Sequence, residues 1–138
     1  MNNQIFPQLP EDIDDTEPES APWSDLVQQD FHVSVYRDRY PVSQGHLLFV
    51  PRYNSITVLS QAFADAVQHG RDRVQAGDWA GFNVGLNYGS AAGQTVAWPH
   101  VHLIPRHTGD VADPTGGVRN VIPGRGRYLP DQPRSDHV

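Results

Sequence analysis

Short apolar segments separated by proline and glycine predict β-strands along much of this 138-residue chain. Where apolar and polar residues alternate, one face of the strand is expected to be buried and the other exposed. A continuous apolar run that ends at a proline instead indicates a strand covered on both sides. The half-buried strands are expected at residues 31–36 and 81–87, the buried strand at residues 46–50, and a further strand between two prolines at residues 100–104.

A single long helix is expected between the strands at residues 46–50 and 81–87. Ser60 is a suitable N-cap for a helix over residues 61–76, and Gly77 suits its C-terminal end. The predicted apolar side of this helix consists of Leu59, Phe63, Val67 and Val74. The order strand, strand, helix, strand, strand favours the α+β class with an antiparallel sheet.

Composition divides the chain into three parts. Residues 1–22 contain four prolines and six acidic residues, so we expect a flexible acidic arm. Residues 23–110 are expected to form the folded domain. Nine of the thirty residues from 109 onward are glycine or proline, so residues 111–138 are expected to be an extension that packs on the domain or is partly flexible.

Residue usage excludes several classes of chemistry. The chain has no cysteine, which removes disulfides, thiolate nucleophiles and cysteine-bound metals, and it has no lysine for a Schiff base. Its net charge of −6 is uneven, because residues 1–30 carry eight acids and no cation, whereas the remainder carries ten arginines and eight acids. A polymeric nucleic acid is therefore an unsuitable partner, while a small anionic substrate is permissible. No apolar run is long enough for a membrane span, and a cytoplasmic location is expected.

The most informative chemical feature is the pair His100 and His102. On a strand these two side chains leave the same face, about 7 Å apart. One imidazole can attack an electrophile while its neighbour donates a proton to the charge that develops. Without further context the pair could equally be two surface histidines. A metal site would need further ligands, and His46 is the one candidate in reach, since residues 79–109 contain no carboxylate.

The segment around this pair resembles the motif of the histidine-triad, or HIT, family of nucleotide hydrolases and transferases. Residues 93–96 read Gly-Gln-Thr-Val, and residues 98–104 read Trp-Pro-His-Val-His-Leu-Ile, where the family has three alternating histidines. Two further segments, residues 38–51 and 81–87, are similar to the family's strand–turn–strand unit and to its Asn-rich strand. The resemblance implies a HIT-like fold, with an antiparallel sheet of about five strands and one main helix.

The resemblance also implies a mechanism and a set of site residues. His100 would attack the α-phosphorus of a nucleotide, for example a diadenosine polyphosphate or an AMP conjugate, and form a covalent nucleotidyl-histidine that water resolves. Its other ring nitrogen would donate to the carbonyl of Trp98, and His102 would bind the phosphate and assist the leaving group. The nucleotide-binding residues would be Asp38, His46, Asn87, Gln94, Thr95 and Trp98. The family further implies a homodimer and no tightly bound cofactor, with Mg²⁺ at most carried by the substrate, and no protein-held metal.

Trp98 departs from the family, because it stands where the first histidine of the triad is expected. The indole could be a packing residue or a wall on which a base stacks. The missing imidazole leaves three functions open. These are hydrolysis through the His100 adduct, transfer of the nucleotidyl group to another acceptor, and nucleotide binding with weak catalysis.

Overall fold

The computed structural model describes residues 9–13 and 22–128. The chain forms two compact units, Met1–His107 and Thr108–Val138. The predicted arm therefore lies largely outside the described residues. Within the described part, no helix has both the length and the hydrophobicity that crossing a membrane requires.

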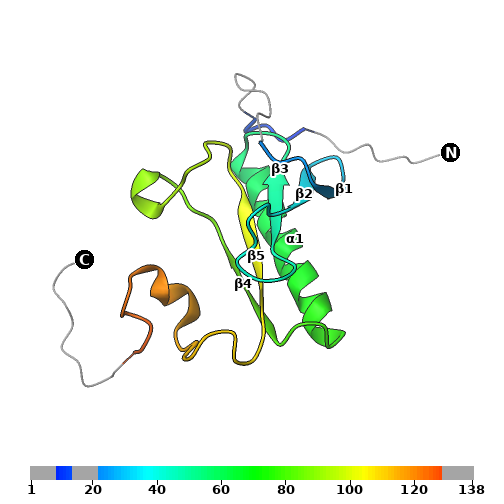
Figure 1. The fold of residues 1–138 in the computed structure, drawn as a ribbon. Helices are drawn as coiled ribbons and strands as arrows, with labels where there is room; N and C mark the ends of the chain where they lie inside the picture. The colour runs from blue at the N-terminus through cyan, green and yellow to red at the C-terminus, as the bar shows by residue number, and fades with distance from the viewer. Residues whose placement is uncertain (1–8, 14–21, 129–138) are drawn as a thin grey trace. The chain divides into compact units, whose positions relative to one another are not determined.

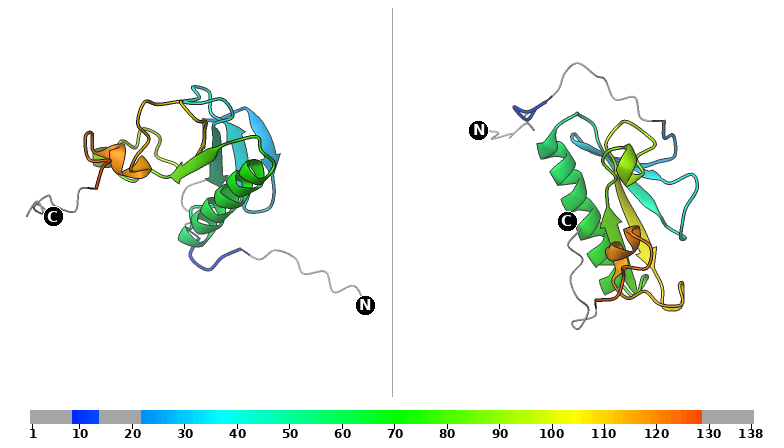
Figure 2. Two further views of the ribbon diagram at one scale, coloured as in Figure 1. Left: turned by 90° about the horizontal axis from the view of Figure 1, so that it is seen from below. Right: turned by 90° about the vertical axis from the view of Figure 1, so that its left-hand side faces the viewer.

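The first unit is built on a five-stranded antiparallel sheet with the order β1-β2-β3-β5-β4 (Figure 1). The fold is α+β, as the sequence predicts, and one main helix, α1, covers one face of the sheet (Figure 2). The strands are β1 (Leu26–Gln29), β2 (Val33–Arg37), β3 (Leu47–Pro51), β4 (Gly81–Gly85) and β5 (Val101–Arg106). The edge strand β1 was not predicted, since all four of its residues are exposed and show no buried alternation.

Strand β2 corrects one prediction. Its first four residues are all buried, so the expected half-exposed strand is covered on both sides. Val33 and Val35 join the core under α1, whereas Tyr36 belongs to a second cluster on the opposite face. That second cluster also contains Leu48, Val50 and Trp98, with Trp23 packed against it. Aromatic side chains from distant segments therefore cover the face that alternation assigned to solvent.

The helix α1 (Ile56–Gln75) begins five residues earlier than predicted. Its N-cap is Ser55 rather than Ser60, because Ser55 has extended backbone angles and its Oγ accepts the N–H of Val58 at 3.1 Å. The β-branched residues that follow Ser55 have low helix propensity, but burial of Val58 outweighs that preference. The predicted end is confirmed, since Ala76 caps the helix and Gly77 has a φ of 81°.

The buried face of α1 differs in part from the prediction, although Leu59 packs against the core as expected. Small residues form it at a spacing of four, namely Val58, Ala62, Ala66 and Gly70. Phe63, which was expected to be buried, is 40% exposed. The close approach explains the choice, because a Cβ at Gly70 would lie 2.7–2.8 Å from the ring of Phe82 on β4. A helix that approaches the sheet this closely needs small side chains at the contact.

We expect Gly70→Ala to lower stability in the native background and to raise it when Phe82 is first replaced by alanine. Overpacking costs about 1–3 kcal/mol, whereas removing a helical glycine gains about 1 kcal/mol. Removing the ring takes away every atom that the new Cβ would meet at short distance, which leaves only the gain, so the sign reverses. Urea unfolding of the two single variants and the double variant measures this cycle. Gly70→Ala raising stability in both backgrounds would contradict the contact.

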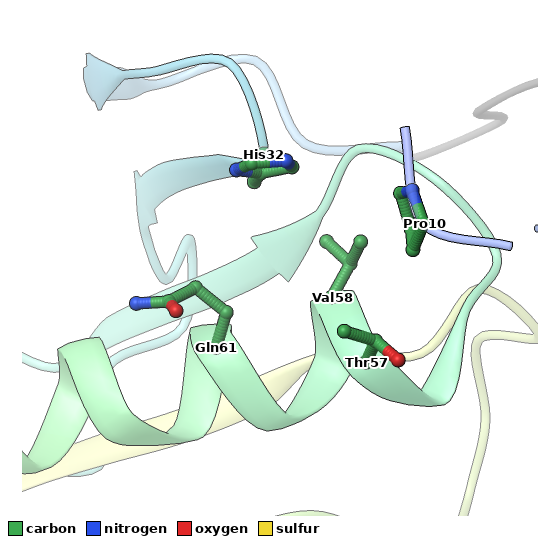
Figure 3. A pocket seen from close by; sticks show the side chains of 5 residues that line it. All are labelled: Pro10, His32, Thr57, Val58 and Gln61. Atoms are coloured by element: carbon green, nitrogen blue, oxygen red, sulfur yellow. The ribbon is translucent and has the colours of Figure 1, made fainter. Parts of the chain in front are cut away.

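A small pocket of about 240 Å³ lies beside the start of α1 and is lined by Pro10, His32, Thr57, Val58 and Gln61 (Figure 3). Nearby, Asp12 accepts hydrogen bonds from the Ser55 hydroxyl at 2.7 Å and from the Thr57 N–H at 3.1 Å. These bonds to the carboxylate lower the pKa of Asp12. The pocket is on the α1 side of the sheet, so it is separate from the face that carries His102.

The second unit is described over residues 108–128 and contains a short 3₁₀ helix, Gly117–Val121. Arg119 donates from Nε to the carbonyls of Arg125 and Gly126, at 3.1 and 3.2 Å. Arg127 pairs with Asp113 at 2.9 Å. These contacts hold the segment in a defined local fold, and they occupy the Nε–H of Arg119 within its own loop.

Candidate active site

Two strands in the middle of the sheet bring the candidate histidines together. His46 directly precedes β3, and His102 lies on β5, with Leu48 and His102 paired across the two strands. Val101 and Leu103 are fully buried under α1, so His102 between them points to the opposite face. His100 lies one residue before β5, and its ring centroid is 5.1 Å from that of His102. The expected pair therefore shares one face.

One hydrogen bond defines the protonation of His100. Its Nδ1 lies 2.8 Å from the carbonyl oxygen of Trp98. A carbonyl only accepts, so Nδ1 carries the proton and donates it. In the neutral ring the lone pair is then on Nε2. The structure thus shows the contact that the family resemblance implied for this residue.

A second chain of hydrogen bonds defines the protons of His46 and His102. The backbone N–H of Val42 donates to His46 Nδ1 at 3.2 Å. The proton of the neutral His46 ring is therefore on Nε2, which lies 2.9 Å from His102 Nδ1. His102 Nδ1 accepts this proton, so His102 keeps its own proton on Nε2. The site then combines a lone pair on His100 with a proton donor on His102.

Burial favours the uncharged forms of His46 and His102. Burial lowers the pKa of His46, which the nearby Asp38 carboxylate opposes. Burial also lowers the pKa of His102 to about 4, and the neighbouring His100 and His46 rings contribute to that shift. At neutral pH His102 is consequently a neutral hydrogen-bond donor.

Asp38, His46 and His102 meet the spacing for a metal ion, since each offers a ligand atom and these atoms lie within 4.8 Å of one another. The hydrogen bonds argue against this use. A metal-bound histidine donates its other ring N–H to an acceptor. The other nitrogen of His46 faces the N–H of Val42, a donor, so its Nε2 carries a proton and has no lone pair for a metal. The cluster fits a hydrogen-bonded group of neutral rings better than a metal site.

Asp38 lies beside the same nitrogen of His46 that faces His102. Its Oδ2 is 3.5 Å from His46 Nε2, and its Oδ1 accepts the N–H of Tyr40 at 2.8 Å. A contact with the ribose, which the resemblance implied for Asp38, stays a prediction.

The other predicted binding residues lie in the segment between β4 and Trp98. Gln94 accepts the Gly89 N–H at 2.8 Å and donates to the carbonyls of Val96 and Ala97, so its amide orders the loop before Trp98. Thr95 is exposed in that loop. Asn87 follows β4, whose last residue, Gly85, pairs with His102. Phosphate contacts by Gln94, Thr95 and Asn87 stay predictions.

Trp98 is 4% exposed and packs within the second core cluster. Its Nε1 donates to the carbonyl of Pro51 at 2.8 Å. The structure thus shows the packing role, and a base could stack on this indole only if the ring left its cluster.

Sequence reasoning missed Trp23 as a neighbour of the site. Its ring centroid lies 4.7 Å from that of His100 and 6.1 Å from that of Tyr36. Together with the Trp98 contact this leaves His100 only 7% exposed. Nothing in the local pattern around Trp23 indicates the contact, because it joins residues 77 positions apart.

Comparison with known protein families and structures identifies the relatives of the chain. The model of the HIT domain family matches residues 22–109. An uncharacterized HIT-like protein from Methanocaldococcus jannaschii is 32% identical over 91 residues, which are 62% of this chain and 70% of that protein. An AP-4-A phosphorylase from Mycobacterium tuberculosis is 39% identical over 79 residues, which are 51% of this chain but 40% of the phosphorylase.

Solved structures show the same similarity. A zinc-bound histidine triad family protein from Mycobacterium smegmatis superposes with a TM-score of 0.59 at 26% identity, covering 67% of this chain and 72% of that one. A HIT family protein from Bacillus anthracis gives a TM-score of 0.54 at 30% identity, with coverages of 62% and 66%.

Proposed function

Since the chain belongs to the HIT domain family of nucleotide-processing proteins, we propose that it cleaves a nucleotide at the α-phosphate through a covalent nucleotidyl-His100. The observation that supports this most is the 2.8 Å hydrogen bond from His100 Nδ1 to the Trp98 carbonyl. It fixes the tautomer that a nucleophilic imidazole needs, with the lone pair on Nε2.

In the first step His100 Nε2 forms a bond to the α-phosphorus, and the bond from phosphorus to the leaving oxygen breaks. The electron pair of that bond goes to the leaving phosphate. His102 donates its Nε2–H to an oxygen of the reacting phosphate, where negative charge develops. Because His102 is neutral, its contribution is a hydrogen bond from a fixed position rather than a full positive charge.

In the second step a water oxygen attacks phosphorus and the bond to His100 Nε2 breaks. The ring recovers its lone pair, the water proton goes to solvent, and the nucleoside monophosphate leaves. Asp38, His46, Asn87, Gln94 and Thr95 are proposed to hold the nucleotide through these two steps. Much of the rate would come from positioning the phosphate beside the two rings.

Transfer to phosphate is a second candidate, favoured by the similarity to the AP-4-A phosphorylase. The first step is the same, but an oxygen of inorganic phosphate replaces water in the second. With diadenosine tetraphosphate the adduct forms with release of ATP. Water then yields AMP, whereas phosphate yields ADP.

The products separate these candidates. The protein is incubated with diadenosine tetraphosphate with and without inorganic phosphate, and AMP, ADP and ATP are quantified. The reaction is also stopped without acid, which would break the phosphorus–nitrogen bond of the adduct, and the mass of the protein is measured. AMP in both incubations supports hydrolysis, and ADP only with phosphate supports transfer. The proposed catalysis would be overturned if calorimetry shows nucleotide binding but neither a product nor an adduct forms. The same must hold when an AMP-amide is the substrate.

A further inference from the structure

Trp98 is bonded to its surroundings through both its main chain and its side chain. Its carbonyl accepts the Nδ1–H of His100, and its indole Nε1–H donates to the carbonyl of Pro51, each at 2.8 Å. We propose that Trp98 is a positioning residue for His100, and that its indole holds the carbonyl that aims the nucleophile. The proposal rests on the nucleophilic role of His100 proposed above.

The first step of the argument is that the anchor of the indole is rigid. Pro51 is the last residue of β3 and is itself buried, and it pairs with Val33 of β2. Its carbonyl is therefore fixed by the sheet. The hydrogen bond crosses from residue 98 to residue 51, so it joins the segment before β5 to the end of β3.

The second step concerns the segment that carries His100. Pairing between β3 and β5 begins at Val101, opposite Phe49, so His100 and the residues before it lie outside the ladder. Pro99 has no N–H to donate to a ladder and fixes only its own φ. The position of the Trp98 carbonyl consequently depends on what holds Trp98 itself. Gln94 holds the carbonyls of the two residues before Trp98, and the buried indole, with its bond to Pro51, holds Trp98 itself.

The third step is the packing around the same ring. The second core cluster, Tyr36, Leu48, Val50 and Trp98, is joined by Trp23, which also contacts His100. A displacement of the Trp98 indole would therefore disturb both the carbonyl bonded to His100 and the Trp23 ring that contacts His100. A nucleophile misplaced by about 1 Å can lose 10²-fold in rate.

A packing role alone makes a different prediction. A large apolar ring would then serve as well as an indole, and its replacement would change stability without changing the tautomer of His100. The two roles are separated by removing the N–H while the shape is kept. Trp98→Phe removes it with some loss of volume. Replacing Trp98 by benzothienylalanine, in which sulfur takes the place of the indole N–H, removes it with almost no change of shape.

The experiment measures two properties of both variants. One is the single-turnover rate of adduct formation with diadenosine tetraphosphate, and the other is the His100 tautomer by ¹⁵N NMR without nucleotide. We expect the rate to fall tenfold or more with little change in KM, and His100 to populate both tautomers. Trp79→Phe is the matched control, since Trp79 packs on the α1 side of the sheet, and it should lower Tm while leaving rate and tautomer unchanged.

The positioning role is overturned if both Trp98 variants keep the wild-type tautomer and, where turnover is observed, the wild-type rate. A wild-type protein without turnover would defeat the proposed function but not this test, because the tautomer is read without nucleotide. In that case a tautomer shift in the benzothienylalanine variant still supports the positioning role, and an unshifted tautomer refutes it.

Discussion

His100→Ala is expected to abolish adduct formation and to slow nucleotide cleavage by about three orders of magnitude or more. The alanine has no ring nitrogen to attack phosphorus, and water would have to attack directly without the covalent intermediate. Quenched samples analysed by mass spectrometry would show the nucleotidyl adduct on the wild-type protein and none on the variant. Binding of a non-cleavable nucleotide by calorimetry should change far less than the rate.

His69→Ala is the control for losing a partly buried histidine. His69 lies on α1, and its ring centroid is 6.0 Å from those of Phe49 and Trp79, on the other side of the sheet from His102. Burial lowers the pKa of this side chain too, so it shares the physical character of the site histidines without their location. The mechanism is wrong if wild-type activity survives in His100→Ala, or if His69→Ala loses as much activity.

The strands and the fold class could be predicted because their signals are local. Residues 47–50 form an apolar run, and β3 contains all four of them. The edge strand β1 could not be found in this way, since its side chains are exposed and its pairing with β2 contributes mainly backbone hydrogen bonds. The second buried face of β2 was also missed, because Trp23 and Trp98 cover it from other parts of the chain.

The helix shows how tertiary contacts outweigh local preference. Both Ser55 and Ser60 can cap a helix, and periodicity alone favoured the later one. The helix begins at Ile56 because Val58 is buried and Ser55 is held by Asp12. Large apolar residues such as Phe63 were expected on the buried face, but the short distance to Phe82 at Gly70 selects small residues there.

At the site, the resemblance predicted the residue types, but only the structure gives their protonation. The Trp98 carbonyl contact was expected and is present. The proton order through Val42, His46 and His102 depends on a backbone N–H four residues before His46, whose direction no sequence pattern specifies. The burial of Trp98 likewise follows from a cluster assembled across β2 and β3. The implied homodimer stays a prediction.

His102→Ala is expected to slow adduct formation by about 10²–10³-fold, the usual effect of removing one donor that stabilises developing charge. His102→Gln should lose less, because its amide N–H can take over part of that role. Single-turnover measurements on both variants test this, with the nucleotide concentration raised until the rate no longer changes. Equal losses in the two variants would contradict a donor role and indicate a role of the ring in packing.

The pH dependence tests the protonation state of His102. Its pKa of about 4 means that the proton on Nε2 belongs to a neutral ring and is retained at and above pH 7. Deprotonation of His102 should therefore cause no decline of kcat/KM between pH 7 and 9. The pH profiles of the wild-type protein and of His102→Gln should have the same shape over that range. The same shift makes the folded state less stable in acid. The unfolded histidine binds a proton below about pH 6.5, whereas the folded one binds a proton only near pH 4. As the pH is lowered from 6.5 to 4, the free energy of unfolding of the wild-type protein should therefore decrease more steeply than that of His102→Gln. A decline of kcat/KM above pH 7 that the glutamine removes would instead identify His102 as a charged general acid.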